Sequence, residues 1–225
     1  DTRTNAGVDH IATFRKMHIW KREGERVLVL MSAGNLSLTQ TVVSLLNEGI
    51  DVGEDDETLL SVSSMFGAAR LVGKAVQQVR EMYGKSLEAE GGKFNVSFIL
   101  GGQIQGRTMR LFHIYDAGNF IEATRETPYF QIGETKYGKP ILDRVLKFDL
   151  SLKQAEKLAL LSMDSTLRSN ISVGMPLDLI VVERDTVKIV AERRVEEDDF
   201  YFEQLRTTWS TSLQQAFHSF PDPGD

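Results

Sequence analysis

Blocks of apolar and polar positions follow one another along the chain and predict its elements. Segments 10–20 and 26–33 predict two strands, and the second is a nearly continuous apolar run, which is typical of a strand buried on both faces. Apolar residues at helical spacing predict helices over 36–49 and 58–88. Short runs separated by turn residues then predict four strands, at 94–101, 108–115, 119–124 and 128–132.

The rest of the chain predicts two helices, two strands and a closing helix, over 136–149, 151–169, 177–183, 186–193 and about 198–217. Ser151 with Gln154 three residues later has the pattern of a capping box at the start of the second of these helices. Blocks of strands that alternate with blocks of helices favour stacked antiparallel sheets covered by helices, an α+β class, over a parallel βαβ sheet. We expect one domain over residues 1–220 and a disordered tail at 221–225.

Composition and charge exclude several classes of function. The chain has 225 residues, a net charge of −6 and an isoelectric point of about 5.3, which argues against nucleic-acid binding because that needs a cationic face. It contains no cysteine, so disulfides, thiolate metal sites and a cysteine nucleophile are excluded. Its four histidines are scattered without a metal-ligand spacing. No apolar run is long enough to span a membrane, and we expect a cytoplasmic protein without metal or cofactor.

The first part of the chain carries motifs that resemble the start of proteasome β subunits. In that family one strand ends in Asp-Ser-Arg-x-Thr-x-Gly, a second carries a lysine, and a third ends in Ala-Gly-Gly before a helix. Here the corresponding residues are the segment 1–7 (DTRTNAG), then Lys16, then Ala33-Gly34-Asn35. Any one of these motifs is weak alone, but their order and spacing together are specific.

Later segments narrow the resemblance to one bacterial branch of the family. The segments FILGGQIQG at 98–106, PYFQIGETKYGKPILDR at 128–144 and SMDSTLRSNISVGMPLDL at 162–179 resemble the proteasome homologue called Anbu, the ancestral β-subunit. The resemblance covers essentially the whole chain. It implies a four-layer αββα sandwich of the N-terminal-nucleophile hydrolase type, with the first strand hairpin incomplete in the printed sequence.

The resemblance also implies a chemistry. The family's nucleophile is an N-terminal threonine on a strand that precedes Asp1, whose own α-amine acts as the base, so Thr2 and Thr4 are not substitutes for it. Lys16 matches the lysine that stabilises the deprotonated oxygen, and Asp1 matches the carboxylate that keeps this lysine charged. Gly34 matches the backbone donor to the oxyanion.

Two further elements of the family pattern depart from it here. The family has a serine in a Gly-Ser-Gly motif, and Glu134 takes its place in Gly133-Glu134-Thr135. The family's Asp-x-x-Ser element falls on 169–172, where Ser169 or Asn170 aligns with the aspartate and Ser172 with the serine. Asp164 is the alternative if a turn of helix is inserted. By position, the substrate-pocket residues would be Thr4, Asn5, Ser32 and Leu36.

Each residue also has an ordinary structural interpretation. Without the resemblance, Asp1 is a solvated chain end, Lys16 an edge-strand charge and Gly34 a turn glycine. Glu134 fits equally well as an acidic residue in the first turn of a helix, where the dipole favours it.

The resemblance favours a threonine peptidase subunit acting on polypeptides in a homo-oligomeric ring or spiral, with helices 36–49 and 58–88 at the subunit contacts. The alternatives are a non-catalytic proteasome-like scaffold and an N-terminal-nucleophile amidase acting on a small molecule. Retention of Asp1, Lys16 and Gly34 favours the peptidase, because a scaffold has no chemical need for a buried lysine. Substrate, subunit number and any unfoldase partner stay open.

Overall fold

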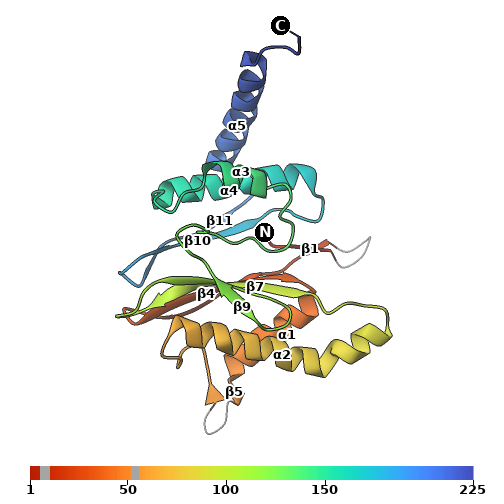
Figure 1. Ribbon diagram of the computed structural model, residues 1–225, viewed down its shortest axis with the longest axis vertical. Helices are drawn as coiled ribbons and strands as arrows, with labels where there is room; N and C mark the ends of the chain where they lie inside the picture. Colours follow the sequence, from red (N-terminus) through yellow and green to blue (C-terminus); the bar gives the residue numbers. More distant parts are fainter. Residues whose placement is uncertain (6–10, 52–55, 225) are drawn as a thin grey trace. The chain divides into compact units, whose positions relative to one another are not determined.

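A computed structural model describes residues 1–5, 11–51 and 56–224 of the chain (Figure 1). The chain forms two compact units. Unit 1 contains Asp1–Ala12, Glu134–Leu179 and Arg193–Asp225, and unit 2 contains Thr13–Gly133 and Ile180–Glu192. The boundaries divide one strand hairpin, residues 177–195. Its base belongs to unit 1, and its tip, Ile180–Glu192, belongs to unit 2.

Unit 2 is built on a five-stranded antiparallel sheet with the order β3-β4-β7-β8-β9. Its strands are β3 (Met17–Arg22), β4 (Arg26–Gly34), β7 (Val96–Ile104), β8 (Arg110–Ile114) and β9 (Phe120–Glu122). Strand β4 pairs along its whole length with β7, from Arg26 opposite Ile104 to Gly34 opposite Val96. This central position explains the continuous apolar run of β4, since residues 27–30 are buried on both faces of the sheet.

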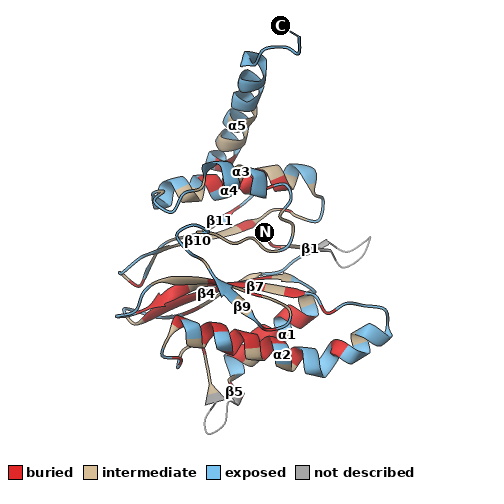
Figure 2. Ribbon diagram, in the orientation of Figure 1, coloured by how far each residue is buried: buried red, intermediate tan, exposed pale blue. Residues whose placement is uncertain are grey.

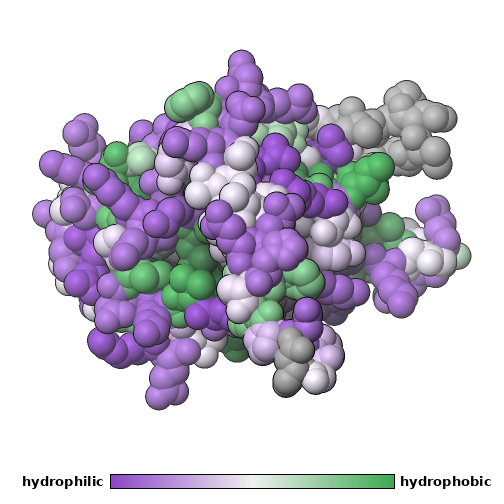
Figure 3. Space-filling model, turned by 90° about the horizontal axis from the view of Figure 1, so that it is seen from above, coloured by the Kyte–Doolittle hydropathy of each residue, from purple (hydrophilic) through white to green (hydrophobic). Residues whose placement is uncertain are grey.

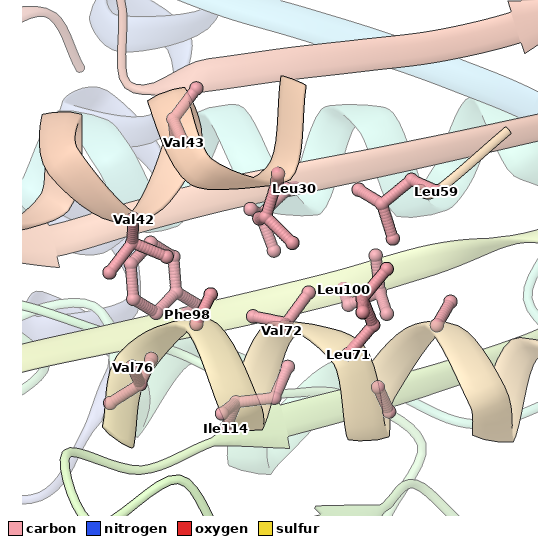
Figure 4. Close-up of a cluster of buried hydrophobic side chains, with 14 of the residues drawn as sticks. Leu30, Val42, Val43, Leu59, Leu71, Val72, Val76, Phe98, Leu100 and Ile114 are labelled. Carbon is pink, nitrogen blue, oxygen red and sulfur yellow. The ribbon is translucent and has the colours of Figure 1, made fainter. Parts of the chain in front are cut away.

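Two helices cover one face of this sheet. They are α1 (Leu36–Glu48) and α2 (Met65–Ala89), and the minor pair β5 (Ile50–Asp51) and β6 (Asp56–Glu57) follows α1. Figure 4 shows the apolar side chains of both helices meeting those of β4, β7 and β8 in the main core. Gly73 lets α2 approach the β8–β9 turn, because a Cβ there would lie 2.2 Å from the Gly118 carbonyl oxygen.

The opposite face of the sheet packs on the tip of the hairpin formed by β10 (Leu177–Glu183) and β11 (Lys188–Val195). Val27 and Val29 of β4 form a second apolar cluster with Val187 and with Ile180 and Ile189. Alternate residues of β4 therefore serve opposite faces, as the two-residue period of a strand requires. Unit 2 thus stacks a helix layer, a sheet and a strand hairpin.

Unit 1 packs three helices with the base of the same hairpin. The helices are α3 (Lys139–Val145), α4 (Leu152–Ser169) and α5 (Phe200–Ser219), and a small pair, β1 (Arg3–Asn5) with β2 (Ile11–Thr13), lies at the start of the chain. Leu160 of α4, Phe202 of α5, and Leu177 and Val195 of the hairpin form its core. The capping box that Ser151 and Gln154 predict is present at the start of α4.

Four predicted elements differ from the structure. The helix predicted over 58–88 begins only at Met65, because residues 58–64 form turns and Ser64 caps the helix. The strand over 10–20 is interrupted at 14–16, so Lys16 lies directly before β3 rather than within a strand. Segment 128–132 is not a strand, since Pro128 has no N–H to donate to a ladder. The helix predicted over 136–149 is shorter, because it begins after Gly138 and Leu146 is already extended.

Candidate active site

Lys16 lies at the edge of the main sheet of unit 2, where β3 begins. Its backbone carbonyl accepts a hydrogen bond from the Ser32 N–H at 2.9 Å, which ties it to β4 next to the paired residues Met17 and Met31. Its side chain is half-buried, and this burial lowers the pKa of the Lys16 amine below its usual value. Ser32 is buried, and its hydroxyl also points to the Lys16 carbonyl, at 3.4 Å.

Gly34 ends β4 in a conformation that few other residues adopt. Its φ of +107° is unfavourable for residues with a Cβ, and a Cβ there would lie 2.3 Å from the Asn95 carbonyl oxygen. The same carbonyl accepts the Asn35 N–H at 2.8 Å, which holds the end of β4 against the start of β7. The fold itself therefore requires glycine at this position.

Helix α1 begins immediately after Gly34. Asn35 caps it, with its side-chain oxygen accepting from the backbone N–H groups of Ser37 at 3.0 Å and Leu38 at 3.3 Å. Leu36, a predicted pocket residue, is the first residue of the helix and is half-buried. The positive end of the helix dipole thus lies beside the exposed Gly34, which is an electrostatic setting that favours a nearby negative charge.

In unit 1 the first residues of the chain are attached to the segment that follows α4. Asp1 accepts a hydrogen bond from the Gly174 N–H at 3.3 Å, and the Thr2 N–H donates to the Pro176 carbonyl at 3.2 Å. Arg3 donates to the Ile171 carbonyl at 2.9 Å. Because Thr2 is fully buried, this attachment belongs to the packed interior of the unit.

The same segment carries a polar network centred on Asn170. The Asn170 amide donates to Glu134 Oε2 at 2.9 Å, and Asn170 Oδ1 accepts from the Ser172 N–H at 2.8 Å and from its hydroxyl at 2.5 Å. Glu134 Oε1 accepts from the Lys136 N–H at 3.0 Å, so both oxygens of the carboxylate are engaged. Glu134 precedes α3 by five residues, which makes its interpretation as a first-turn helix charge wrong.

The predicted site residues thus fall into one set in each unit. Unit 1 brings together Glu134 and Ser172 through Asn170, with Asp1 bound to the same segment at Gly174. Ser169 is the last residue of α4 and is exposed, so of the two residues aligned with the family aspartate it is Asn170 that joins the network.

The remaining candidates are placed as follows. Thr4 is half-buried in β1, and Asn5 lies in the same strand, although its side chain is outside the described residues. Asp164 is buried and accepts from Arg206 at 2.8 Å, with Arg168 at 3.5 Å. That pairing places Asp164 in the packing of α4 with α5 rather than in the Asn170 network.

Sequence reasoning missed one polar pair on the sheet of unit 2. Ser97 Oγ and His113 Nε2 lie 2.8 Å apart on neighbouring strands, and the histidine ring lies against Tyr115 and Phe130. Burial lowers the pKa of His113, which favours the neutral imidazole near pH 7. The pair is recognisable in the sequence only once the register of β7 with β8 is known.

No group of three or more histidine, cysteine, aspartate or glutamate residues among the described ones could hold a metal ion. Within 1–5, 11–51 and 56–224, none of the helices combines the length and the apolar character that crossing a membrane requires.

Comparison with known proteins identifies close structural relatives. The chain is 54% identical to Anbu from Hyphomicrobium sp. strain MC1, with a TM-score of 0.90 over 99% of this chain and 92% of that one. It is 51% identical to Anbu (ancestral beta-subunit) from Yersinia bercovieri, with a TM-score of 0.90 over 98% and 91%. The helical assembly of the Anbu complex from Pseudomonas aeruginosa is 47% identical, with a TM-score of 0.90 over 100% and 92%.

More distant relatives are proteasome subunits as well. The family model for the proteasome subunit matches residues 68–182. A proteasome subunit beta from Haloquadratum walsbyi is 25% identical over 169 residues, which is 75% of this chain but only 62% of the length of that relative. With the solved structures, these matches confirm the predicted fold class, an α+β fold of the N-terminal-nucleophile type.

Proposed function

The chain belongs to the Anbu family of proteasome-type subunits, and we propose that it is a threonine-type peptidase subunit that hydrolyses amide bonds in polypeptides. The proposal assigns the nucleophile to an N-terminal threonine ahead of Asp1, as the resemblance implies. The resemblance assigns Lys16, Asp1 and Gly34 to the charges and donors around it.

The burial of Lys16 is the observation that carries the proposal. Desolvation disfavours the ammonium form and lowers the pKa of this amine. A lysine in such a position reduces stability relative to an apolar residue. Its presence there therefore suits a role that needs its charge or its proton. Perturbed pKa values of this kind cluster at functional sites, where acids, bases and cations work close to neutral pH.

The chemistry follows from what a threonine hydroxyl requires. As the hydroxyl oxygen attacks the substrate carbonyl carbon, its proton passes to the threonine's own α-amine, and Lys16 stabilises the negative charge that develops on the attacking oxygen. Collapse of the tetrahedral intermediate expels the amine of the substrate, which takes up the proton, and leaves an acyl ester. Water then hydrolyses the ester and restores the threonine. Asp1 is the carboxylate that the resemblance assigns to this lysine.

Gly34 and the start of α1 are suited to stabilise the oxyanion, the second negative charge that develops in the reaction. The tetrahedral intermediate carries a negative oxygen that needs preorganised donors. Gly34 has no side chain to obstruct the approach of the substrate carbonyl, and the N-terminus of α1 contributes positive potential there. In this proposal the backbone around Gly34 binds the oxyanion, while Leu36, Ser32, Thr4 and Asn5 keep their assignment to the substrate pocket.

The Glu134–Asn170–Ser172 network takes the place of the family's serine and aspartate. That family pattern combines a neutral hydroxyl with one carboxylate, whereas here Glu134 provides the carboxylate and Asn170 the neutral partner. The network therefore carries one negative charge, as the family pattern does. Here the charge lies on Glu134, in the position of the family serine, and Asn170 in the aspartate position is neutral. A carboxylate near the α-amine would stabilise the ammonium that forms when the amine accepts the hydroxyl proton. We assign this role to Glu134, held in place by Asn170.

We also propose that the subunits assemble into a homo-oligomer, a ring or a spiral. The relative from Pseudomonas aeruginosa is a helical assembly. In unit 2, α2 exposes Phe66, Met82 and Tyr83, each about half accessible, which suits the predicted contact through α1 and α2.

Hydrolysis of a peptide library by purified full-length protein tests the peptidase. Intact mass and N-terminal sequencing first establish the terminal residue, which is expected to be threonine. Lys16→Ala should then lower turnover by about two orders of magnitude or more, the scale for loss of one charge-stabilising group. Lys21→Ala removes an exposed lysine from β3 and is the matched control, which should retain turnover.

The other outcomes separate the alternatives. If Lys16→Ala cleaves a substrate as fast as the wild type does, the catalytic assignment of Lys16 is wrong. If the wild type has an N-terminal threonine and cleaves no peptide, the non-catalytic scaffold gains support. Cleavage of small amides without cleavage of peptides would indicate the amidase.

A further inference from the structure

The polar pair of Ser97 and His113 lies beside the end of β4, where the proposed oxyanion donor Gly34 is found. Ala33 and Ser97 are paired in register, and so are Gly34 and Val96. The histidine lies one strand further, on β8, with its Nε2 atom 2.8 Å from Ser97 Oγ. Neighbouring strands of a sheet are about 4.8 Å apart, so the backbone of His113 is about 10 Å from that of β4. A peptide bound at Gly34 therefore has residues within reach of the pair.

The pair and the predicted substrate pocket belong to opposite faces of the sheet. Ser32 is paired with Phe98, which is buried in the main core with α1 and α2. Consecutive residues of a strand point to opposite faces, so Ala33 and its partner Ser97 belong to the face on which the tip of the β10–β11 hairpin packs. A chain bound at Gly34 therefore meets a different set of side chains on each face.

Aromatic rings surround the histidine. The centroid of its ring lies 4.3 Å from that of Tyr115 and 5.6 Å from that of Phe130. Figure 2 shows the buried residues concentrated in β4, β7 and α2. In contrast, the four side chains that form the His113 cluster are only half-buried: Ser97, His113, Tyr115 and Phe130. The cluster is therefore partly open to a ligand.

The electrostatic surroundings of His113 differ from those of the chain as a whole. Acidic residues outnumber basic ones by 32 to 26, and hydrophilic side chains cover most of the face of the molecule in Figure 3. Burial lowers the pKa of His113, and no carboxylate among the described residues raises it again. Within the same residues, His113 Nδ1 and the Tyr115 hydroxyl make no hydrogen bond. An anionic ligand would therefore find free hydrogen-bonding groups here and would stabilise the imidazolium.

We propose that the His113 cluster binds an acidic side chain, aspartate or glutamate, of the residue that follows the scissile bond of the substrate. Successive side chains of an extended peptide point in opposite directions. A residue that enters the predicted pocket of Ser32 and Leu36 is therefore followed by one that points to the face of the His113 cluster. This assignment rests on the proposed peptidase function and adds the class of substrate to it.

Binding requires the uptake of one proton. The neutral imidazole takes this proton from water as the carboxylate approaches, and the ring then donates from both nitrogens. Nε2–H donates to Ser97 Oγ, and Nδ1–H donates to the carboxylate. Hydrogen bonds between ionised groups are about twice as strong as neutral ones, so a substrate with glutamate at this position should be preferred over one with alanine about 10-fold or more.

Chemical modification of histidine tests the binding without requiring catalysis. Diethyl pyrocarbonate acylates neutral imidazole, and mass mapping of the modified full-length protein reads His113 and His218 separately. The probes are the tripeptide amides Glu-Ala-Ala, Gln-Ala-Ala and Lys-Ala-Ala, which represent the fragment after the scissile bond. At saturation the Glu probe should slow the modification of His113 about 10-fold, because the carboxylate covers the ring and keeps it protonated.

The other probes and the second histidine are the controls of this measurement. The Gln and Lys probes should protect His113 much less, and the exposed His218 of α5 should react at one rate throughout. Equal protection of His113 by the Glu and Gln probes would overturn the choice of a carboxylate, and no protection by the Glu probe would overturn the site.

Cleavage profiles test the specificity. In a peptide library varied after the scissile bond, the wild type should cleave preferentially before aspartate or glutamate. His113→Gln should lower kcat/KM about 10-fold for the glutamate peptide and less than about 2-fold for the alanine peptide, since only the former uses the cluster. Ser97→Ala removes the acceptor of Nε2–H and should give the same pattern with a smaller loss, about 3-fold. His218→Gln should keep the wild-type profile.

The outcomes separate this inference from the peptidase itself. A wild type that cleaves peptides without regard to the residue after the scissile bond would overturn the inference and leave the peptidase intact. A wild type that cleaves no peptide, while the Glu probe still protects His113, would contradict the peptidase and support the anion-binding cluster.

Discussion

Replacing Gly34 with alanine should destabilise the protein through three effects that the structure makes explicit. The left-handed φ of +107° costs a residue with a side chain about 1–3 kcal/mol. The new Cβ would lie 2.3 Å from the Asn95 oxygen and 3.1 Å from the Val96 Cα, which are backbone atoms that cannot rotate away. Moving β7 to relieve this overlap costs about 1–3 kcal/mol more, and it weakens the Asn35–Asn95 hydrogen bond, worth about 1 kcal/mol.

We therefore expect Gly34→Ala to lower the unfolding free energy by about 3–7 kcal/mol. For a chain of this size, 1 kcal/mol corresponds to a shift in Tm of about 2–4 °C, so Tm should fall by about 6 °C or more in calorimetry or circular dichroism. Gly24→Ala is the matched control. Its φ is also positive, at +69°, but no atom lies within 4 Å of the added Cβ, so it should lose about 1–2 kcal/mol and only a few degrees.

Equal shifts in Tm for Gly34→Ala and Gly24→Ala would refute this reasoning, because only at position 34 does the added Cβ overlap backbone atoms of Asn95 and Val96. The result also bears on function. Since the fold alone requires glycine at position 34, loss of peptidase activity in Gly34→Ala would not test its proposed role at the oxyanion. The catalytic proposal has to be tested at residues that the fold does not demand, such as Lys16 and Glu134.

The other predictions concern these two residues. Burial holds the pKa of Lys16 below its usual 10.5, so the cation is lost as pH rises through that lowered value. Peptidase turnover should therefore begin to fall on the alkaline side below pH 10.5. The unfolding free energy should change in the opposite direction. Between the pKa of Lys16 in the folded chain and its higher pKa in the unfolded chain, the unfolded chain binds more protons, so the wild type should gain unfolding free energy relative to Lys16→Met as pH rises. Parallel curves of unfolding free energy against pH for the two proteins would contradict the assignment. Glu134→Ser removes the carboxylate of the Asn170 network and Asn170→Asp adds a second one, so each should lower kcat/KM about 10-fold or more, whereas the double variant should recover most of it. If the losses in kcat/KM of the two single variants simply add in the double variant, Glu134 and Asn170 do not act through one common negative charge.

The sequence by itself predicted the features that depend on interactions between residues close together in the chain. The capping box of Ser151 and Gln154 joins residues three apart, and the end of β4, the cap at Asn35 and the start of α1 follow one another without a gap. The apolar run of β4 predicts its central position in the sheet, because such a strand must be buried on both faces. The fold class followed from the blocks of strands and helices, and the resemblance of the motifs identified the family.

Tertiary structure decided whatever depends on partners distant in the sequence. Asn170 joins Glu134 across 36 residues and Ser97 meets His113 across 16, and nothing in either local pattern indicates the other member. Segment 128–132 has the composition of a strand but forms none, and the side chains of α5 are mostly exposed beyond the Arg206–Asp164 pair. The physical reason is common to these cases: side-chain type and spacing determine which surface an element offers, but only the packed chain determines what that surface meets.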